Sequence, residues 1–202
     1  MSPAGNLYAS TLIHPRPSDP PAPTLALVAA VALHEAVGVF LHSPSPYAGG
    51  ARTADRLTIK WPNDLLLGGA KLSGILLERA SDAVVAGFGV NLAHHPALAD
   101  RPTTSLAAHG IDVAPEAMLD VLADAFARWL GTWRGQGIAP IRSAWLDRAH
   151  PVGTALGVRL PDGDGDRLDG LFDGLDRDGA LLLRLAGGER RVIHAADVFL
   201  LS

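Results

Sequence analysis

Cysteine is absent from the 202-residue chain, and the chain has no excess of positive charge. The lack of cysteine excludes disulfides, thiolate metal sites and a cysteine nucleophile. The 17 Lys and Arg residues stand against 21 Asp and Glu residues, so the formal net charge of -4 provides no basic field for nucleic acid. A hydrophobic fraction of 48% is typical of a folded globular protein.

Neither a signal peptide nor a clean membrane span is evident. The first ten residues lack both the basic run and the apolar core of a signal peptide. The most apolar stretch, residues 25–41, carries His34 and Glu35 near its middle, so we interpret it as a buried core helix. We therefore expect no membrane association and a cytoplasmic location.

The first 150 residues are predicted to combine helices with a β-sheet. Apolar residues at helical spacing predict helices at 24–37, 115–133 and 138–150. Period-2 alternation and short Gly or Pro turns predict strands at 57–61, 65–67, 71–78 and 83–90. Because these strands follow one another through short turns, the sheet is expected to be antiparallel or mixed.

The remaining residues predict a small β module. Pro151 and Gly153 end the helical pattern, and short apolar segments separated by Gly and Asp turns follow them. Several short strands within about fifty residues favour a small barrel. We therefore predict two domains, at 1–150 and 151–202.

One hairpin carries most of the functional information. Segment 60–64 reads KWPND, and segment 71–78 reads KLSGILLE after a short turn. This pair resembles the signature hairpin of biotin–protein ligases, which reads KWPND and then K-L-x-G-I-L-x-E. Identities at fixed spacing that include Trp and Pro are far more specific than a lone glycine motif.

The resemblance runs over nearly the whole chain. It includes segment 2–10, the G-x-G-x-N strand end at 87–92, a T-S-L at 104–106, and the C-terminal segments 174–181 and 196–198. The family fold then implies an α+β domain related to class II aminoacyl-tRNA synthetases, with a mixed sheet and flanking helices. A small SH3-like β-barrel would follow.

The resemblance also implies an activity. Members of the family use ATP to form biotinyl-5'-AMP and transfer biotin to a lysine of the biotin carboxyl carrier protein of acetyl-CoA carboxylase. ATP, Mg²⁺ and biotin are the implied cofactors and substrate, and a homodimer is a family expectation. Two alternatives are a truncated, non-catalytic homologue that acts only as a binding protein, and a lipoate or octanoate transferase of the same superfamily.

Lys71 is the leading catalytic candidate. Formation of an acyl-adenylate brings a carboxylate against the α-phosphate of ATP, and a fixed cation offsets the repulsion between these two anions. By resemblance, Lys71 contacts both the biotin carboxylate and the phosphate. The residues alone leave a solvated hairpin lysine equally open. Lys60 is a lower-ranked second phosphate contact, with an edge-strand charge as its alternative.

The other candidates follow from the same hairpin. Gly74 would let the backbone approach biotin or its adenylate, beside an apolar wall of Ile75 and Leu76. Trp61 would frame this pocket. An ordinary strand and a core tryptophan are the alternative interpretations.

Three polar side chains are candidates for binding ATP and Mg²⁺. Asn63 and Asp64 could hold Mg²⁺ or orient the triphosphate, or they could form a Pro-Asn-Asp turn. Asn91 could pair with the edge of adenine or simply terminate a strand. No metal site built from protein alone is predicted, because Asp162, Asp164 and Asp166 imitate an EF-hand start without its glycine.

The sequence differs from the family's pattern in two places. Family segments N-terminal to the equivalent of Ser2, among them a Gly-Arg-Gly-Arg-like loop over biotin, have no counterpart in the sequence. We therefore expect either a misplaced gene start or a truncated paralogue, and no winged-helix domain or DNA binding. Where family members often carry an arginine after the terminal Asp-Val pair, this chain ends with residues 200–202, LLS.

Overall fold

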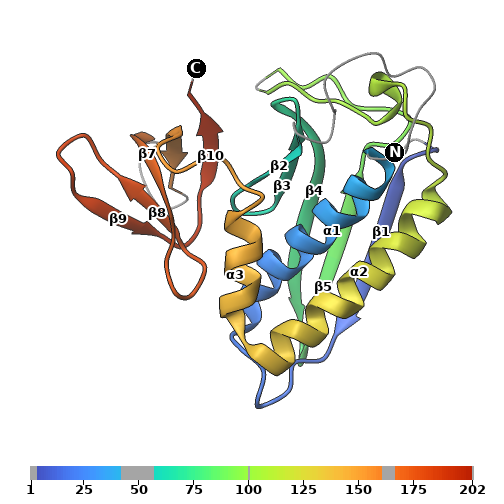
Figure 1. Ribbon diagram of the computed structural model, residues 1–202, viewed down its shortest axis with the longest axis horizontal. Helices are drawn as coiled ribbons and strands as arrows, with labels where there is room; N and C mark the ends of the chain where they lie inside the picture. Colours follow the sequence, from blue (N-terminus) through green and yellow to red (C-terminus); the bar gives the residue numbers. More distant parts are fainter. Residues whose placement is uncertain (1–3, 42–56, 100, 161–166, 202) are drawn as a thin grey trace.

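The structure, a computed structural model, describes residues 4–41, 57–99, 101–160 and 167–201. In these ranges, a helix-covered sheet lies beside a second, smaller sheet (Figure 1). Residues 42–53, whose Pro and Gly content predicts a loop, lie outside the described residues, as do Ser2 and the aspartates at 162, 164 and 166. The α+β class is confirmed.

The first sheet follows the order β1-β5-β4-β3-β2. All of its ladders within the described ranges are antiparallel, so the expected mixed sheet is reduced to two isolated parallel bridges. Short turns explain this pairing, because β3–β4 and β4–β5 are hairpins. The strands are β1 (Leu7–Ile13), β2 (Leu57–Lys60), β3 (Asp64–Leu67), β4 (Ala70–Ala80) and β5 (Ala83–Val90).

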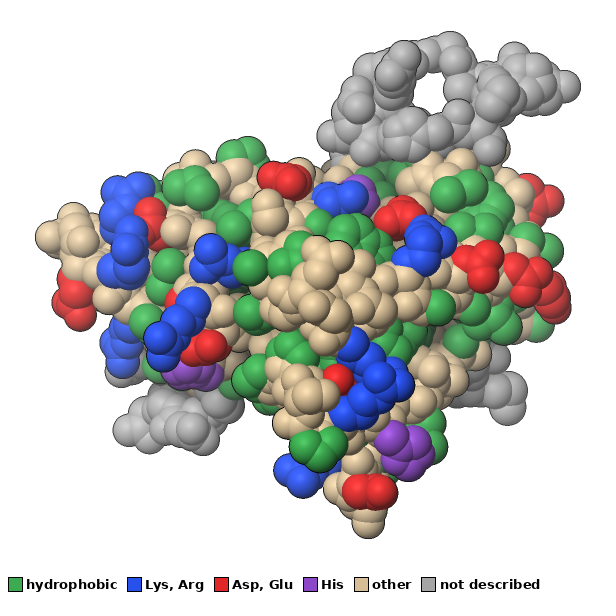
Figure 2. Space-filling model, turned by 60° about the horizontal axis from the view of Figure 1, so that its bottom comes forward, with side chains coloured by type: hydrophobic (Ala, Val, Ile, Leu, Met, Phe, Trp, Pro, Cys, Tyr) green, Lys and Arg blue, Asp and Glu red, His purple; other side chains and the backbone are tan. Residues whose placement is uncertain are grey.

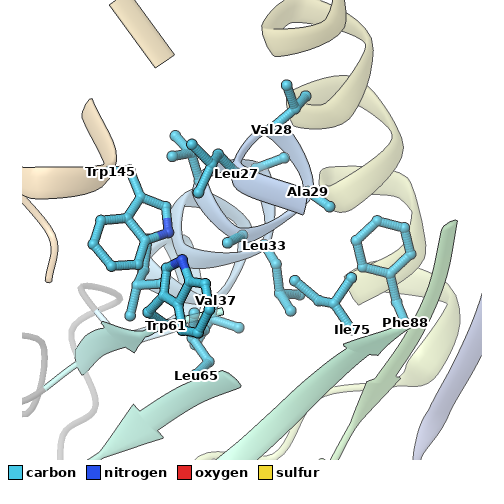
Figure 3. Close-up of a cluster of buried hydrophobic side chains, with 14 of the residues drawn as sticks. Leu27, Val28, Ala29, Leu33, Val37, Trp61, Leu65, Ile75, Phe88 and Trp145 are labelled. Atoms are coloured by element: carbon cyan, nitrogen blue, oxygen red, sulfur yellow. The ribbon is translucent and has the colours of Figure 1, made fainter. Parts of the chain in front are cut away.

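Helix α1 (Leu25–Leu41) is the centre of the core. The helical segment Ala22–Leu41 that contains α1 is long and apolar enough to cross a membrane, but 72% of its most apolar window is buried inside the protein. The prediction of a core helix is therefore confirmed. Val28 and Leu33 are fully buried, and Figure 3 shows them among side chains from the sheet and from α3.

Helices α2 (Pro115–Gln136) and α3 (Ile138–Leu146) complete the helical layer. The apolar stripe of α2 faces inward, and the Phe126 ring meets the Phe88 ring edge-on at 5.8 Å between centroids. The predicted third helix stops at Leu146, four residues earlier than expected. Figure 1 shows α1 and α2 on the same face of the first sheet, which leaves the opposite face open.

The second sheet follows the order β10-β6-β7-β8-β9. Its terminal strands, β9 and β10, are not paired with each other in the described part of the chain, so the expected SH3-like barrel is an open antiparallel sheet. The division at residue 150 stays a prediction. The strands are β6 (Ala155–Arg159), β7 (Arg167–Leu175), β8 (Leu181–Arg184), β9 (Arg190–Ile193) and β10 (Asp197–Leu200).

The two sheets meet at a tryptophan. The indole N–H of Trp61 donates to the carbonyl of Gly179, in the β7–β8 turn, over 3.2 Å. A Cβ on Gly179 would lie 2.8 Å from Leu27 of α1, and its φ of 88° favours glycine. Trp61 also lies next to Trp145 of α3 (Figure 3). The turn therefore packs directly on the first sheet and its helices.

Surface charges are distributed in small groups. On the face shown in Figure 2, Lys and Arg side chains lie in several clusters, with Asp or Glu side chains nearby. Ion pairs within the described residues include Arg190 with Asp173 at 2.5 Å and Arg134 with Asp19 at 3.3 Å. This face therefore presents no single continuous basic surface.

Candidate active site

A cavity of about 710 Å³ lies over the open face of the first sheet. Backbone and side chains of β1, β3, β4 and β5 line it, and residues 196–198 of the second sheet close one side. Seven of the nine candidate residues from the sequence line it: Lys60, Asn63, Asp64, Lys71, Gly74, Ile75 and Leu76.

A buried carboxylate joins two lysines at the wall of this cavity. Asp64 is 5% exposed, and its Oδ1 lies 2.6 Å from Nζ of Lys71. Its Oδ2 lies 3.2 Å from Nζ of Lys60. Sheet pairing produces this cluster, because Asp64 is opposite Lys60 on β2 and opposite Gly74 on β4. One carboxylate thus faces two ammonium groups.

The two lysines differ in their environment. The Lys60 side chain is 11% exposed, and its ammonium also donates to the carbonyl of Val198 over 2.9 Å. Burial lowers the pKa of Lys60, although the Asp64 carboxylate opposes that shift. The Lys71 side chain is 27% exposed and is therefore the more accessible of the two cations.

The backbone of Lys71 is held by a segment distant in sequence. Its N–H donates to the carbonyl of Pro102, and its carbonyl accepts from the N–H of Thr104, each over 2.9 Å. The register of the β3–β4 pair also shifts next to this position, between Leu65 and Leu66. These contacts fix the direction in which the Lys71 side chain leaves the strand.

Glycines form the floor of the cavity. A Cβ on Gly74 would lie 3.4 Å from Nζ of Lys71 and 3.6 Å from Oδ1 of Asp64. Gly89 pairs with Gly74, and Gly87 pairs with Leu76. A ligand can therefore reach the backbone of these strands, while the Leu76 side chain, 58% exposed, offers an apolar surface beside it.

Asn63 both lines the cavity and holds the hairpin. Its side-chain amide donates to the carbonyl of Ile75 over 2.5 Å, and its own carbonyl accepts from the Ile75 N–H over 2.9 Å. The structural interpretation of the Pro-Asn-Asp turn is therefore supported. A role in binding ATP stays a prediction.

Trp61 and Asn91 do not line the cavity. Trp61 is 5% exposed and packs in the core between α1 and the second sheet (Figure 3). The side-chain amide of Asn91 donates to the carbonyl of Thr104 over 2.9 Å. Both placements fit the structural alternatives, a core tryptophan and a strand-terminating asparagine. Their ligand roles are predictions that this geometry does not support.

Several cavity residues were missed from the sequence. Arg101, Tyr8, Ser10 and Asp197 all line it. Arg101 stands three residues before the T-S-L segment at 104–106, so that motif was the available signal. Its guanidinium lies 5.8 Å from the centre of the Phe199 ring.

The described residues contain no cluster of three or more His, Asp or Glu side chains that could hold a metal ion. Asp64 is the one carboxylate of the lysine cluster, and both of its oxygens contact ammonium groups. A single carboxylate suits Mg²⁺ when phosphate oxygens supply the other ligands. The site can therefore accommodate Mg²⁺ that is bound to a nucleotide, if one oxygen of Asp64 gives up its contact with a lysine ammonium and binds the ion instead.

Two family models match the chain. The Biotin/lipoate A/B protein ligase family matches residues 1–92, and the Biotin protein ligase C terminal domain matches residues 157–201. The biotin–acetyl-CoA-carboxylase ligase of Paracoccus denitrificans is 41% identical, over 98% of this chain and 82% of that protein. The ligase of the same name from Mycobacterium tuberculosis is 32% identical, over 86% of this chain and 61% of its own length.

Solved structures support the same fold. The biotin protein ligase of Aquifex aeolicus in complex with biotin and ATP matches with a TM-score of 0.79 and 20% identity, over 97% of this chain and 79% of that one. Its apo form matches with a TM-score of 0.78. The sequence identity over nearly the whole chain and the two family models show that this chain belongs to the biotin protein ligase family.

Proposed function

We propose that the chain is an ATP-dependent biotin–protein ligase that forms biotinyl-5'-AMP and transfers biotin to a lysine of the biotin carboxyl carrier domain of acetyl-CoA carboxylase. The observation that carries this proposal is the Lys71–Asp64 pair at the wall of a cavity with a glycine and leucine floor. A ligand with an apolar body and an anionic end suits this arrangement. The name of the Paracoccus denitrificans relative supports the choice of acceptor.

The first step joins two anions. An oxygen of the biotin carboxylate attacks the α-phosphorus, the bond from that phosphorus to the bridging oxygen breaks, and its electron pair leaves with pyrophosphate. The Lys71 ammonium offsets the repulsion between carboxylate and phosphate and the charge that builds on the phosphoryl oxygens. Asp64 orients this ammonium, because it contacts Nζ at 2.6 Å.

The second step releases AMP. The neutral amine of the acceptor lysine attacks the acyl carbon of biotinyl-5'-AMP, the acyl–oxygen bond breaks, and the amine loses one proton as the amide forms. AMP leaves as an anion beside the same lysine cluster, which favours its departure. The cavity on the open sheet face is accessible from solvent, because Tyr8 and Leu76 in its lining are both exposed, Tyr8 by 53%. A carrier domain can therefore reach it.

We assign roles to the cavity residues on this basis. Lys71, Gly74, Ile75 and Leu76 would contact biotin or its adenylate, and Asn63 and Asp64 would face the triphosphate and its Mg²⁺. Residues 1–150 would supply the catalytic domain, and residues 151–202 would close one side of the cavity. We place the reaction in the cytoplasm. A homodimer is an expectation of the family resemblance.

Product analysis of the purified chain tests the proposal. With biotin, ATP and Mg²⁺, mass spectrometry should detect biotinyl-5'-AMP, and pyrophosphate should appear in equal amount. Addition of a biotin carboxyl carrier domain should give biotin on one lysine. Octanoate and lipoate in place of biotin are the matched controls. Transfer of either acid without biotin transfer would support a lipoate or octanoate transferase, and bound biotin without pyrophosphate would support a binding protein.

A further inference from the structure

Two buried polar atoms in the described part of the chain have no hydrogen-bond partner. They are Nε1 of Trp145, in α3, and Nε2 of His150, in the connection between α3 and β6. Trp145 is 1% exposed, so bulk solvent does not reach its indole N–H. A buried polar atom without a partner has lost its hydration and gained no bond in exchange, and folded proteins retain few such atoms. Each of these two nitrogens therefore requires an explanation.

Both residues line one small cavity at the junction of the two sheets. Figure 3 shows the Trp145 ring there, beside Trp61. The cavity has a volume of about 10 Å³, which is about the space that one water molecule needs. Cavities that stay dry have apolar walls, whereas two residues with unpartnered nitrogens line this one. The other lining residues come from both sheets and from the connection: Ile59, Lys60, Trp61, Ala149, Leu156, Phe172, Leu181 and Val198.

The hydrogen-bonding capacity of these side chains determines how water can bind between them. An indole N–H only donates, so Trp145 needs an acceptor, which a water oxygen supplies. A water that accepts this bond still has two hydrogens to donate. Among the described lining residues, the imidazole of His150 is the only side chain that can accept one, because Lys60 and Trp61 only donate and the rest are apolar.

Both partners are held in place by the structure around them. Ile59 of β2 forms a parallel bridge with Ala149, which fixes the connection next to His150 against the first sheet. The ring of Trp145 packs against the ring of Phe172 in β7, at 6.3 Å between centroids. A water that binds between the two nitrogens therefore requires no rearrangement of the chain.

We propose that this cavity binds one water molecule, which accepts a hydrogen bond from the indole N–H of Trp145 and donates one to Nε2 of His150. His150 is then a neutral imidazole that carries its hydrogen on Nδ1. The water joins α3 to the connection that enters the second sheet, so it is part of the junction between the two sheets. This inference does not depend on the proposed function, because it concerns only how the sheets are joined.

A crystal structure at a resolution that shows ordered water tests the proposal directly. One peak of electron density should lie within about 3.2 Å of both Nε1 of Trp145 and Nε2 of His150. Trp133 provides the control in the same map, because its indole N–H donates to the Thr24 hydroxyl over 2.8 Å and should bind no water. A map without density between the first two nitrogens, or with a direct hydrogen bond between them, would overturn the proposal.

Nitrogen NMR tests the direction of the second hydrogen bond. At about pH 7.5 His150 is neutral, because burial lowers its pKa from an ordinary value of 6.5. A long-range proton–nitrogen spectrum should then assign its hydrogen to Nδ1, and the His150→Leu spectrum identifies its signals by their loss. A hydrogen on Nε2 would leave the water without a side-chain acceptor and would contradict the proposal.

A double-mutant cycle measures whether the two residues share a partner. Trp145→Phe and His150→Leu each remove one side of the water site, so the second substitution should cost less when the first is present. The unfolding equilibrium constant of the double variant should therefore differ from the product of the single effects by at least about threefold. Trp133→Phe with His150→Leu is the matched control, because Trp133 does not line the cavity. The effects of this control pair should multiply to within about twofold.

The outcomes distinguish water from direct packing. Coupling between Trp145 and His150, together with the density peak, supports the bridging water. Coupling without that peak would assign the effect to direct contact between the two rings and would overturn the proposal. Effects that multiply as in the control pair, in variants whose melting curves show a folded protein, would show that no shared partner joins the two residues and would also overturn it.

Discussion

Oδ1 of Asp64 lies 2.6 Å from Nζ of Lys71, in a pair where the carboxylate is buried and the ammonium is partly exposed. The second oxygen of Asp64 binds Lys60, which burial places in an unfavourable environment for its charge. The carboxylate therefore has two functions: it stabilises a buried cation and orients an accessible one.

Asp64→Asn should cost both stability and activity. It leaves the Lys60 ammonium buried beside a neutral amide, so the free energy of unfolding should fall by about 3 kcal/mol, the lower end of the range for a broken buried pair. Urea unfolding measures this change, and pyrophosphate release should fall in parallel. Asp173→Asn is the control, because its arginine partners are 42% and 60% exposed and such pairs contribute less than about 1 kcal/mol. Wild-type stability in Asp64→Asn would refute the assigned role.

Gly74→Ala should impair catalysis with little loss of stability. The added methyl group would lie 3.4 Å from Nζ of Lys71, so the ammonium must move by a few tenths of an ångström. Displacement of a reacting group on this scale can cost up to about 100-fold in rate. Gly135→Ala in α2 is the control, because its methyl group meets nothing within 4 Å and a helical alanine should add about 0.5–1 kcal/mol. Equal activity in the two variants would contradict the role of Gly74.

Trp61→Phe should lower the stability of the fold without lowering the affinity for biotin. The variant loses the indole hydrogen bond to the Gly179 carbonyl, and an unmade buried hydrogen bond costs about 1–3 kcal/mol. Thermal unfolding should show this loss, while the biotin dissociation constant should stay within about twofold. A large loss of biotin affinity at unchanged stability would show instead that Trp61 frames the ligand.

Acid should destabilise the fold through His150. Burial lowers the pKa of His150 from its usual value of 6.5, and the Lys60 charge adds to that shift. Because the unfolded chain takes up the proton first as the pH falls below 6.5, stability should decrease from there down to the lowered pKa of the folded state.

A variant isolates this contribution. His150→Gln should lose less unfolding free energy than the unsubstituted chain between about pH 7.5 and about pH 5.5, measured by urea titration. His14→Gln serves as the control, because the His14 side chain is 65% exposed. An identical pH profile in His150→Gln and the unsubstituted chain would remove His150 as the cause.

The local features of the site could be predicted from the sequence. The KWPND segment joins β2 to β3 and the KLSGILLE segment lies in β4, which pairs with β3, and seven of the nine candidate residues line one cavity. Local signals suffice here because a hairpin brings near neighbours in sequence together. The burial of residues 25–41 was also predictable, since His34 and Glu35 interrupt an otherwise apolar run.

The long-range features could not be predicted in this way. Arg101 and Asp197 reach the cavity from segments outside the hairpin, and no local pattern encodes that approach. Trp61 belongs to the signature motif yet faces the core, because alternation along β2 and the turn at Gly179 determine its direction. Short strands alone also did not distinguish an open sheet from a closed barrel.

The most direct test of the central claim compares the rate of biotinyl-5'-AMP formation in Lys71→Ala with that of the unsubstituted chain, under single-turnover conditions. Loss of the only accessible cation that Asp64 orients in the described site should lower this rate by about 10²–10³, the scale for removal of one electrostatic donor. Adenylate formation at an unchanged rate in folded Lys71→Ala would contradict the account.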